Sequence, residues 1–212
     1  MKKPPVPVLF EDEFLLAVDK PSGMLSVPDR WDKKEENLHA VLEDWTKMKI
    51  YVVHRLDRDT SGVIVFAKTQ DSHRHLSLQF ETRFVRKEYL ALAQGIMRED
   101  SGTLAYPIAH NLRNPGVMIT SPFGKFAQTD FTVLERFPKA GYTWVALRPL
   151  TGKTHQIRVH LRCAGHPVAG DEVYGSGEKI YLSRLKKRYK VSKDGEEKPL
   201  MGRMALHAHA LK

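Results

Sequence analysis

The chain has 212 residues, of which 42% are hydrophobic and 28% are charged, and its formal net charge is +9 at pH 7. This balance is typical of a globular protein rather than a disordered one, and no apolar run approaches the length that crosses a bilayer. Cys163 is the one cysteine, which excludes an internal disulfide and a cysteine-rich zinc site. Because no signal-peptide core follows the N-terminal Met1, we expect a cytoplasmic protein.

Apolar runs of strand length alternate with polar or glycine-containing turns along the chain. The runs at 14–18, 52–53, 63–68, 89–93, 131–137 and 143–148 predict strands. One-faced apolar patterns predict helices over 30–47, after an N-cap at Asp71, and over 154–164, where Gly165 ends the helix. Strands outnumber helices without regular βαβ alternation, which favours an α+β fold. We expect one domain, residues 1–212, with a mixed, largely antiparallel sheet flanked by helices and loops.

The loop at 54–62, HRLDRDTSG, places two carboxylates and two guanidiniums among apolar runs. Such charge is costly to hold near a core unless the groups pair or perform chemistry. A polar turn with surface ion pairs would explain the composition. A carboxylate between arginines on a loop that a sheet positions would equally suit a nucleophile or an acid/base group.

The order of residues in this loop resembles the H-R-L-D-x-x-T-S-G signature of the RluA-type pseudouridine synthases. Four further blocks resemble motifs of the same family, in the expected order along the chain. They are VDKPSGML at 18–25, KEYLA at 87–91, TGKTHQIRVHL at 151–161 and GHPVAGDEVYG at 165–175. The resemblance implies the pseudouridine synthase fold, with a catalytic cleft across the sheet, and isomerisation of uridine in RNA to pseudouridine.

The resemblance also implies roles for individual residues. Asp57 corresponds to the catalytic aspartate, and Arg158 to the arginine that keeps this carboxylate ionised. Tyr89 would stack on the target base or serve a proton transfer. Arg55 would fill the space left by the extruded uridine, and Ile157 would form an apolar wall of the base pocket. Read from the pattern alone, Arg158 could be a surface residue, and Tyr89 and Ile157 ordinary core residues.

The segment 179–203 is strongly basic, with nine lysines and arginines against three acidic residues. We expect Lys186, Lys187 and Arg188 to bind RNA phosphates, although a basic loop without a specific partner has the same composition. The expected partner is a stem-loop of ribosomal or transfer RNA, because unpaired bases are cheaper to extrude. We expect a monomer with no membrane, metal or cofactor partner.

Three alternatives compete with this hypothesis. The string Gly152-Lys153-Thr154 ends like a P-loop, but Leu147 stands where the first glycine is required. A nucleoside hydrolase would use Asp57 and Asp59 as a carboxylate pair, although two residues apart on one loop is poor spacing for that purpose. An RNA-binding protein without turnover is the third possibility, and the intact set of candidate catalytic residues argues against it.

Overall fold

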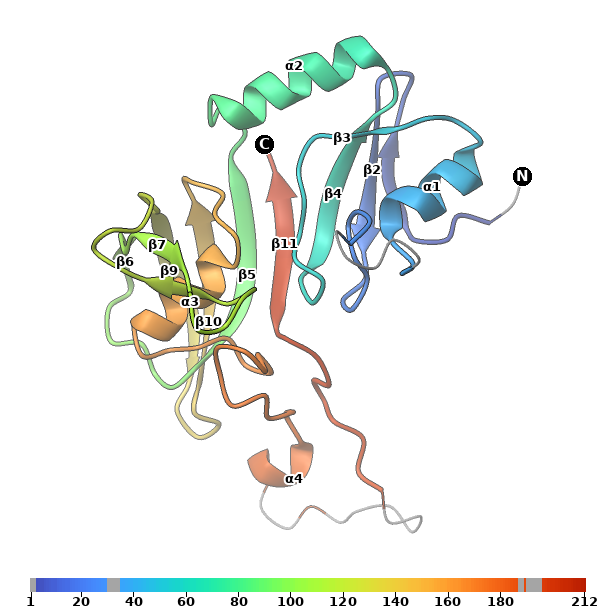
Figure 1. The fold of residues 1–212 in the computed structure, drawn as a ribbon. Coiled ribbons are helices and arrows are strands. Elements are labelled where there is room, and N and C mark those ends of the chain that lie inside the picture. Colours follow the sequence, from blue (N-terminus) through green and yellow to red (C-terminus); the bar gives the residue numbers. More distant parts are fainter. Residues whose placement is uncertain (1–2, 30–34, 187–188, 190–195) are drawn as a thin grey trace. The chain divides into compact units, whose positions relative to one another are not determined.

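The computed structural model describes residues 3–29, 35–186, 189 and 196–212 (Figure 1). The chain divides into two compact units. The first comprises Met1–Lys87 with His207–Lys212, and the second comprises Glu88–Leu206. Whether residues 1–212 act as one catalytic domain stays a prediction.

The first unit is built on a sheet whose central strands are β2 and β4. Strand β2 (Leu15–Lys20) pairs antiparallel with β1 (Val8–Glu11) and with β4 (Ser61–Ala67). The short β3 (Tyr51–Val52) is antiparallel to β4, whereas β11 (Leu206–Leu211) runs parallel to it. Apolar side chains of the sheet and of helix α1 (Leu38–Thr46) are fully buried, which makes this the core of the unit.

The two helices of this unit begin at conventional caps. The Asn37 side chain accepts a hydrogen bond from Ala40 N, so α1 begins at Leu38; the expected helix was longer, and its residues 30–34 lie outside the described residues. Helix α2 (Gln70–Glu81) begins with a capping box between Thr69 and Ser72. The prediction of Asp71 as N-cap is therefore wrong. The carboxylate of Asp71 lies in the first turn, where its negative charge interacts favourably with the helix dipole.

The second unit contains a four-stranded antiparallel sheet in the order β5, β10, β9, β6. These strands are Lys87–Gln94, Tyr142–Pro149, Thr129–Phe137 and Ser101–Leu104. A separate hairpin joins β7 (Ile108–His110) to β8 (Met118–Thr120), and the helices are α3 (Gln156–Cys163) and α4 (Leu182–Leu185). Val145, Leu147 and Leu161 are fully buried in one apolar cluster, so α3 packs on the sheet through its apolar face.

The predicted fold class is confirmed, because the sheets are mixed, mostly antiparallel and accompanied by few helices. Helix α3 begins at Gln156 rather than at 154, since the preceding His155 adopts a left-handed conformation with φ of 54°. No helix among the described residues is long and apolar enough to cross a membrane.

Candidate active site

The loop that carries Asp57 is fixed through its backbone carbonyls. Ser26 Oγ donates to the Leu56 carbonyl over 2.8 Å and accepts from Leu56 N over 3.0 Å. On the other side of Asp57, Ser22 Oγ donates to the Asp59 carbonyl over 2.7 Å, and Gly23 N donates to the Arg58 carbonyl over 2.9 Å. The turn at 21–26 thus holds the peptide groups on both sides of Asp57, which restricts where its carboxylate points.

Lys20 joins this turn to the loop. Its side chain is fully buried, and Nζ donates to the carbonyls of Pro21, Met24 and Arg58 over 2.9, 2.6 and 2.8 Å. Burial lowers the pKa of Lys20 to about 8, although the negative charges of Asp59 and Asp57 oppose this shift. An ammonium placed here interacts electrostatically with Asp57 and also donates three hydrogen bonds that hold the loop.

His54 anchors the start of the same loop. Its Nε2 accepts a hydrogen bond from Val65 N of β4 over 3.0 Å, which leaves the ring proton on Nδ1. The ring stacks on Phe80 of α2 with 4.5 Å between centroids. Burial, together with the nearby charge of Lys87, lowers the pKa of His54 to about 4, so the ring is neutral at physiological pH.

The charged side chains of the loop differ in exposure. Asp57 is partly exposed, while Arg55 and Arg58 are exposed. Arg58 pairs with Glu35 over 2.7 Å, so it has a structural partner within the first unit. The Asp59 carbonyl accepts the hydrogen bond from Ser22 Oγ and is one of the groups that fix the loop.

In the second unit Arg158 is buried, with 3% of its surface exposed. Its guanidinium binds Asp171 through two hydrogen bonds, Nε to Oδ2 at 2.7 Å and Nη2 to Oδ1 at 2.9 Å. Burial alone would raise the pKa of the Asp171 carboxyl, but Arg158 and the backbone N–H groups of Tyr174 and Val173 together lower it. The surface-residue alternative for Arg158 is wrong, because this bidentate pair holds the guanidinium rigidly inside the unit.

Tyr174 covers the same guanidinium. Its ring lies 4.9 Å from Arg158 Cζ, and its hydroxyl accepts from Met118 N over 2.8 Å and contacts His155 Nδ1 over 2.8 Å. The left-handed backbone at His155 turns this imidazole toward the tyrosine. One aromatic residue therefore links the start of α3, the β7–β8 hairpin and the Arg158–Asp171 pair.

The other candidate residues of the second unit lie on strand β5, on helix α3 and directly after helix α4. Tyr89 pairs with Leu147 across β5 and β10 and is partly exposed, packed against the apolar cluster of this unit. Ile157 belongs to that cluster and is 6% exposed. Lys186 directly follows α4 and is exposed, while Lys187 and Arg188 lie outside the described residues.

Three residues that contact and hold the candidate site residues had no predicted role: Lys20, Asp171 and Tyr174. All lie inside the blocks VDKPSGML and GHPVAGDEVYG, so the motifs themselves were the available signal. A lysine at the end of an apolar strand gives no indication of complete burial. An aspartate thirteen residues after an arginine likewise gives no indication of a bidentate pair.

Comparison with known proteins places these features in a family. The family model for RNA pseudouridylate synthase matches residues 14–162. A dual-specificity RNA pseudouridine synthase RluA from Vibrio vulnificus is 39% identical over 180 residues, covering 83% of this chain and 72% of that protein. An uncharacterized RNA pseudouridine synthase, YhcT of Bacillus subtilis, is 39% identical over 178 residues, covering 82% of this chain and 59% of that protein.

Solved structures show the same likeness. The chain superimposes on human RNA pseudouridylate synthase domain containing 1 with a TM-score of 0.75 and 29% identity, covering 100% of this chain and 80% of the human one. Human RNA pseudouridylate synthase domain containing 4 gives a TM-score of 0.69 and 26% identity, covering 97% and 83% of the two chains.

Proposed function

This chain belongs to the RluA family of RNA pseudouridine synthases, and on that premise we propose that Asp57 is its catalytic carboxylate. The observation that carries the proposal is the fixed loop. Hydrogen bonds from Ser26, Lys20 and Ser22 hold the carbonyls on both sides of Asp57, while Asp57 itself is partly exposed. A reactive group on a rigid turn is preorganised, because little conformational freedom is lost when the substrate binds.

The reaction suits a single carboxylate. The N1–C1′ bond of uridine breaks, the base turns, and a C5–C1′ bond forms; C5 loses a proton and N1 gains one, so no outside reactant is consumed. Asp57 would begin this sequence either by attacking the nucleoside or by abstracting a proton from it. Both routes need a carboxylate without its proton, and the buried ammonium of Lys20 lies within electrostatic range of Asp57.

Tyr89 and Arg158 are proposed to serve the same reaction. The Tyr89 ring offers a stacking face for uracil and a hydroxyl for proton transfer. Arg158 contributes a permanent positive charge whose direction is fixed by Asp171. Ile157 would supply the apolar wall of the base site from the core cluster to which it belongs.

The proposed substrate is a stem-loop of ribosomal or transfer RNA. Extruding a uridine costs a few kcal/mol of stacking, and the exposed guanidinium of Arg55 could replace the missing base. Lys186, Lys187 and Arg188 are proposed to bind phosphates. We further propose that the protein acts as a monomer in the cytoplasm without a metal or cofactor.

The first prediction concerns Asp57→Asn. Pseudouridines are mapped in RNA from cells that lack the protein and again after return of the wild type, Asp57→Asn or Asp59→Asn. The neutral amide can neither attack nor abstract a proton, so we expect activity to fall by about 10³-fold or more and the target sites to stay unmodified. Asp59→Asn is the matched control, since it changes the same kind of residue in the same loop.

The proposal therefore requires Asp57→Asn and Asp59→Asn to give different pseudouridine maps. Sites that return with Asp59→Asn but not with Asp57→Asn identify the RNA, the uridine and the carboxylate together. Full restoration by Asp57→Asn would show that another group performs the chemistry. Restoration by neither variant would mean that the loop needs both charges for its structure.

A further inference from the structure

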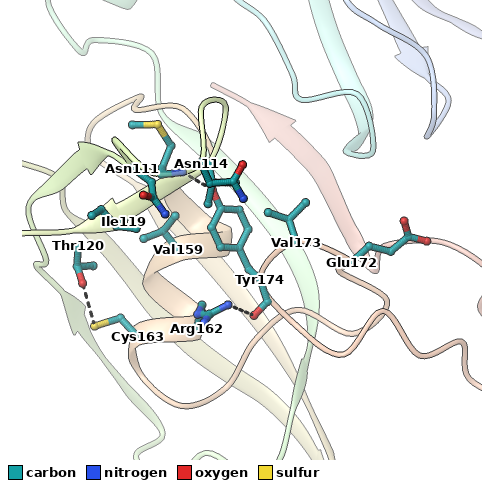
Figure 2. Close-up of a pocket in the computed structure, with 12 residues that line it drawn as sticks. Asn111, Asn114, Ile119, Thr120, Val159, Arg162, Cys163, Glu172, Val173 and Tyr174 are labelled. Atoms are coloured by element: carbon teal, nitrogen blue, oxygen red, sulfur yellow. Dashed lines mark hydrogen bonds between the residues drawn. The ribbon is translucent and has the colours of Figure 1, made fainter.

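A pocket of about 730 Å³ opens on the second unit beside α3 (Figure 2). Its walls come from the β7–β8 hairpin, from α3, and from the segment that carries Tyr174. Figure 2 shows Tyr174 at its centre, Asn111 and Asn114 on the hairpin side, and Arg162 near the base of the tyrosine. The volume falls in the range of small-ligand sites, which is roughly 300–1,000 Å³.

The pocket combines exposed apolar surface with polar groups. Val173 and Ile119 are 44% and 40% exposed, although both are large enough to be expected in a core. Val159 of α3 is buried and closes the apolar floor. The carboxamides of Asn111 and Asn114 can each donate and accept hydrogen bonds.

The walls are formed before any ligand binds. In the hairpin turn, Asn111 N donates to the Val117 carbonyl over 2.9 Å, Val117 N donates to the Asn114 carbonyl over 3.1 Å, and Asn111 Oδ1 accepts from Arg113 N over 2.9 Å. The Tyr174 hydroxyl ties this hairpin down by accepting from Met118 N. A ligand would therefore meet fixed surfaces and lose little affinity to ordering them.

The charges select the class of ligand. Arg162 is exposed and lines the pocket, with a bond of 3.5 Å from Nη1 to the Tyr174 carbonyl. Glu172 also lines the pocket. Its carboxylate disfavours binding of a free anion but readily accepts hydrogen bonds from the amino groups of bases. Flat apolar faces, polar edges and one phosphate are combined in an unpaired nucleotide. A protein of net charge +9 that acts on RNA favours this polyanion over a peptide.

We propose that this pocket binds an unpaired nucleotide of the RNA substrate, with its base against Val173 and Ile119 and its phosphate toward Arg162. The identity of the ligand rests on the function proposed above, while the pocket itself does not. Its tyrosine wall also covers the Arg158 guanidinium, so an occupied pocket would lie against the residue that covers this arginine. The pocket would then contribute to the choice of RNA.

The test is binding of fluorescently labelled RNA hairpins with a randomised loop, measured by anisotropy over a range of salt concentrations. Val173→Trp fills the pocket from an exposed position, and Leu134→Trp is its control at a site on β9 that is 47% exposed. Losing the apolar contacts of one base predicts binding about tenfold weaker for Val173→Trp, and about twofold or less for the control. Arg162→Gln should make the salt dependence shallower by about one unit, whereas Arg98→Gln, an exposed arginine away from the pocket, should not.

Sequencing the bound hairpins gives a second readout. The wild type should enrich particular nucleotides at one loop position, and Val173→Trp should lose that enrichment. If both pocket variants bind like their controls and keep the same enrichment, the proposal is overturned and the pocket serves another ligand. If Val173→Trp does not fold, Arg162→Gln decides alone. Binding needs no turnover, so a failure of the Asp57 proposal would appear in the pseudouridine map and not here.

Discussion

Among single residues, Lys20 offers the sharpest link between structure and chemistry. Its buried ammonium donates to three carbonyls at once, and one of them belongs to Arg58, the residue after Asp57. A buried cation normally destabilises a protein. Here its three hydrogen bonds to carbonyls hold the loop in place. We regard Lys20 as a positioning residue, because it acts on the reaction through the orientation of the loop that carries Asp57.

The second prediction therefore concerns Lys20→Met. Methionine has a similar length but donates nothing, so the loop should lose its central anchor. We expect kcat to fall by about tenfold or more while KM for the RNA changes little, measured by the rate of pseudouridine formation. The exposed Lys139→Met is the control, and an equal loss in both variants would remove Lys20 from the mechanism.

Lys20 also predicts a pH dependence. Its pKa is lowered to about 8 in the fold, so above this pH the amine is neutral and has two donors for three carbonyls. The wild-type rate should decline above about pH 8, and Lys20→Met should lack this decline. Stability changes in the opposite sense: between about pH 8 and pH 10.5 the unfolded chain holds a proton that the folded one has lost, so the free energy of unfolding rises with pH.

At this scale the sequence offered candidates for the reactive residues but no indication of the residues that hold them. Asp57 and Arg158 stand in motifs whose residue types already indicate chemistry. The buried partner Asp171 is separated from Arg158 by a helix end and a turn. Such a pair depends on three-dimensional packing, for which no spacing rule exists.

At the scale of elements, Gly62 shows how the first sheet accommodates a parallel strand. Its φ is +115°, and a Cβ at this position would meet the backbone of Ala208 on β11, with Ala208 N at 2.6 Å. The pair Gly62 and Ala208 is also one of the two registered pairs of β4 with β11. Any larger residue would push β11 away from β4, directly beyond the loop that carries Asp57.

A further prediction is that Gly62→Ala destabilises the protein by about 2–3 kcal/mol, measured by denaturant unfolding. Gly141→Ala separates the two causes, because Gly141 has a φ of +73° but open space around its Cβ position. We expect the control to lose only about 1–2 kcal/mol from backbone strain. Equal losses would mean that the contact with β11 contributes nothing.

The sequence predicted some of the observed strands well and missed others. Strands with strong apolar runs, such as β4 and β10, were predicted within a few residues because burial on both faces leaves a clear pattern. Strands β1 and β11 were not predicted. Three of the four residues of β1 are exposed, so burial does not mark it. Strand β11 alternates histidine with alanine, and alanine is depleted in strands, so its sequence lacks the β-branched and aromatic residues that mark one.

For the molecule as a whole, net charge is the property that matters most for an RNA substrate. Ion pairs such as Arg184 with Glu178, 2.7 Å apart, order the surface without changing the total of +9. In the 179–203 segment basic residues exceed acidic ones by six. Glu197 is one of the three acidic residues of this segment. Its carboxylate accepts a hydrogen bond from Ser183 N at the start of α4, so this carboxylate already has a partner within the fold.

The last prediction follows from this surplus. Each phosphate contact releases counterions from RNA, so affinity should fall steeply as salt is added. Replacing Lys186 and Lys187 together by glutamine should weaken binding at low salt and make the slope of log K against log salt shallower by about one to two units. The double variant of Arg98 and Lys139 removes the same charge from other exposed positions and should keep the wild-type slope apart from a small uniform loss. If both double variants have the same slope, the segment acts only through net charge. If their slopes differ as expected while the specificity readout of the pocket stays intact, affinity and choice of RNA come from separate parts of the protein.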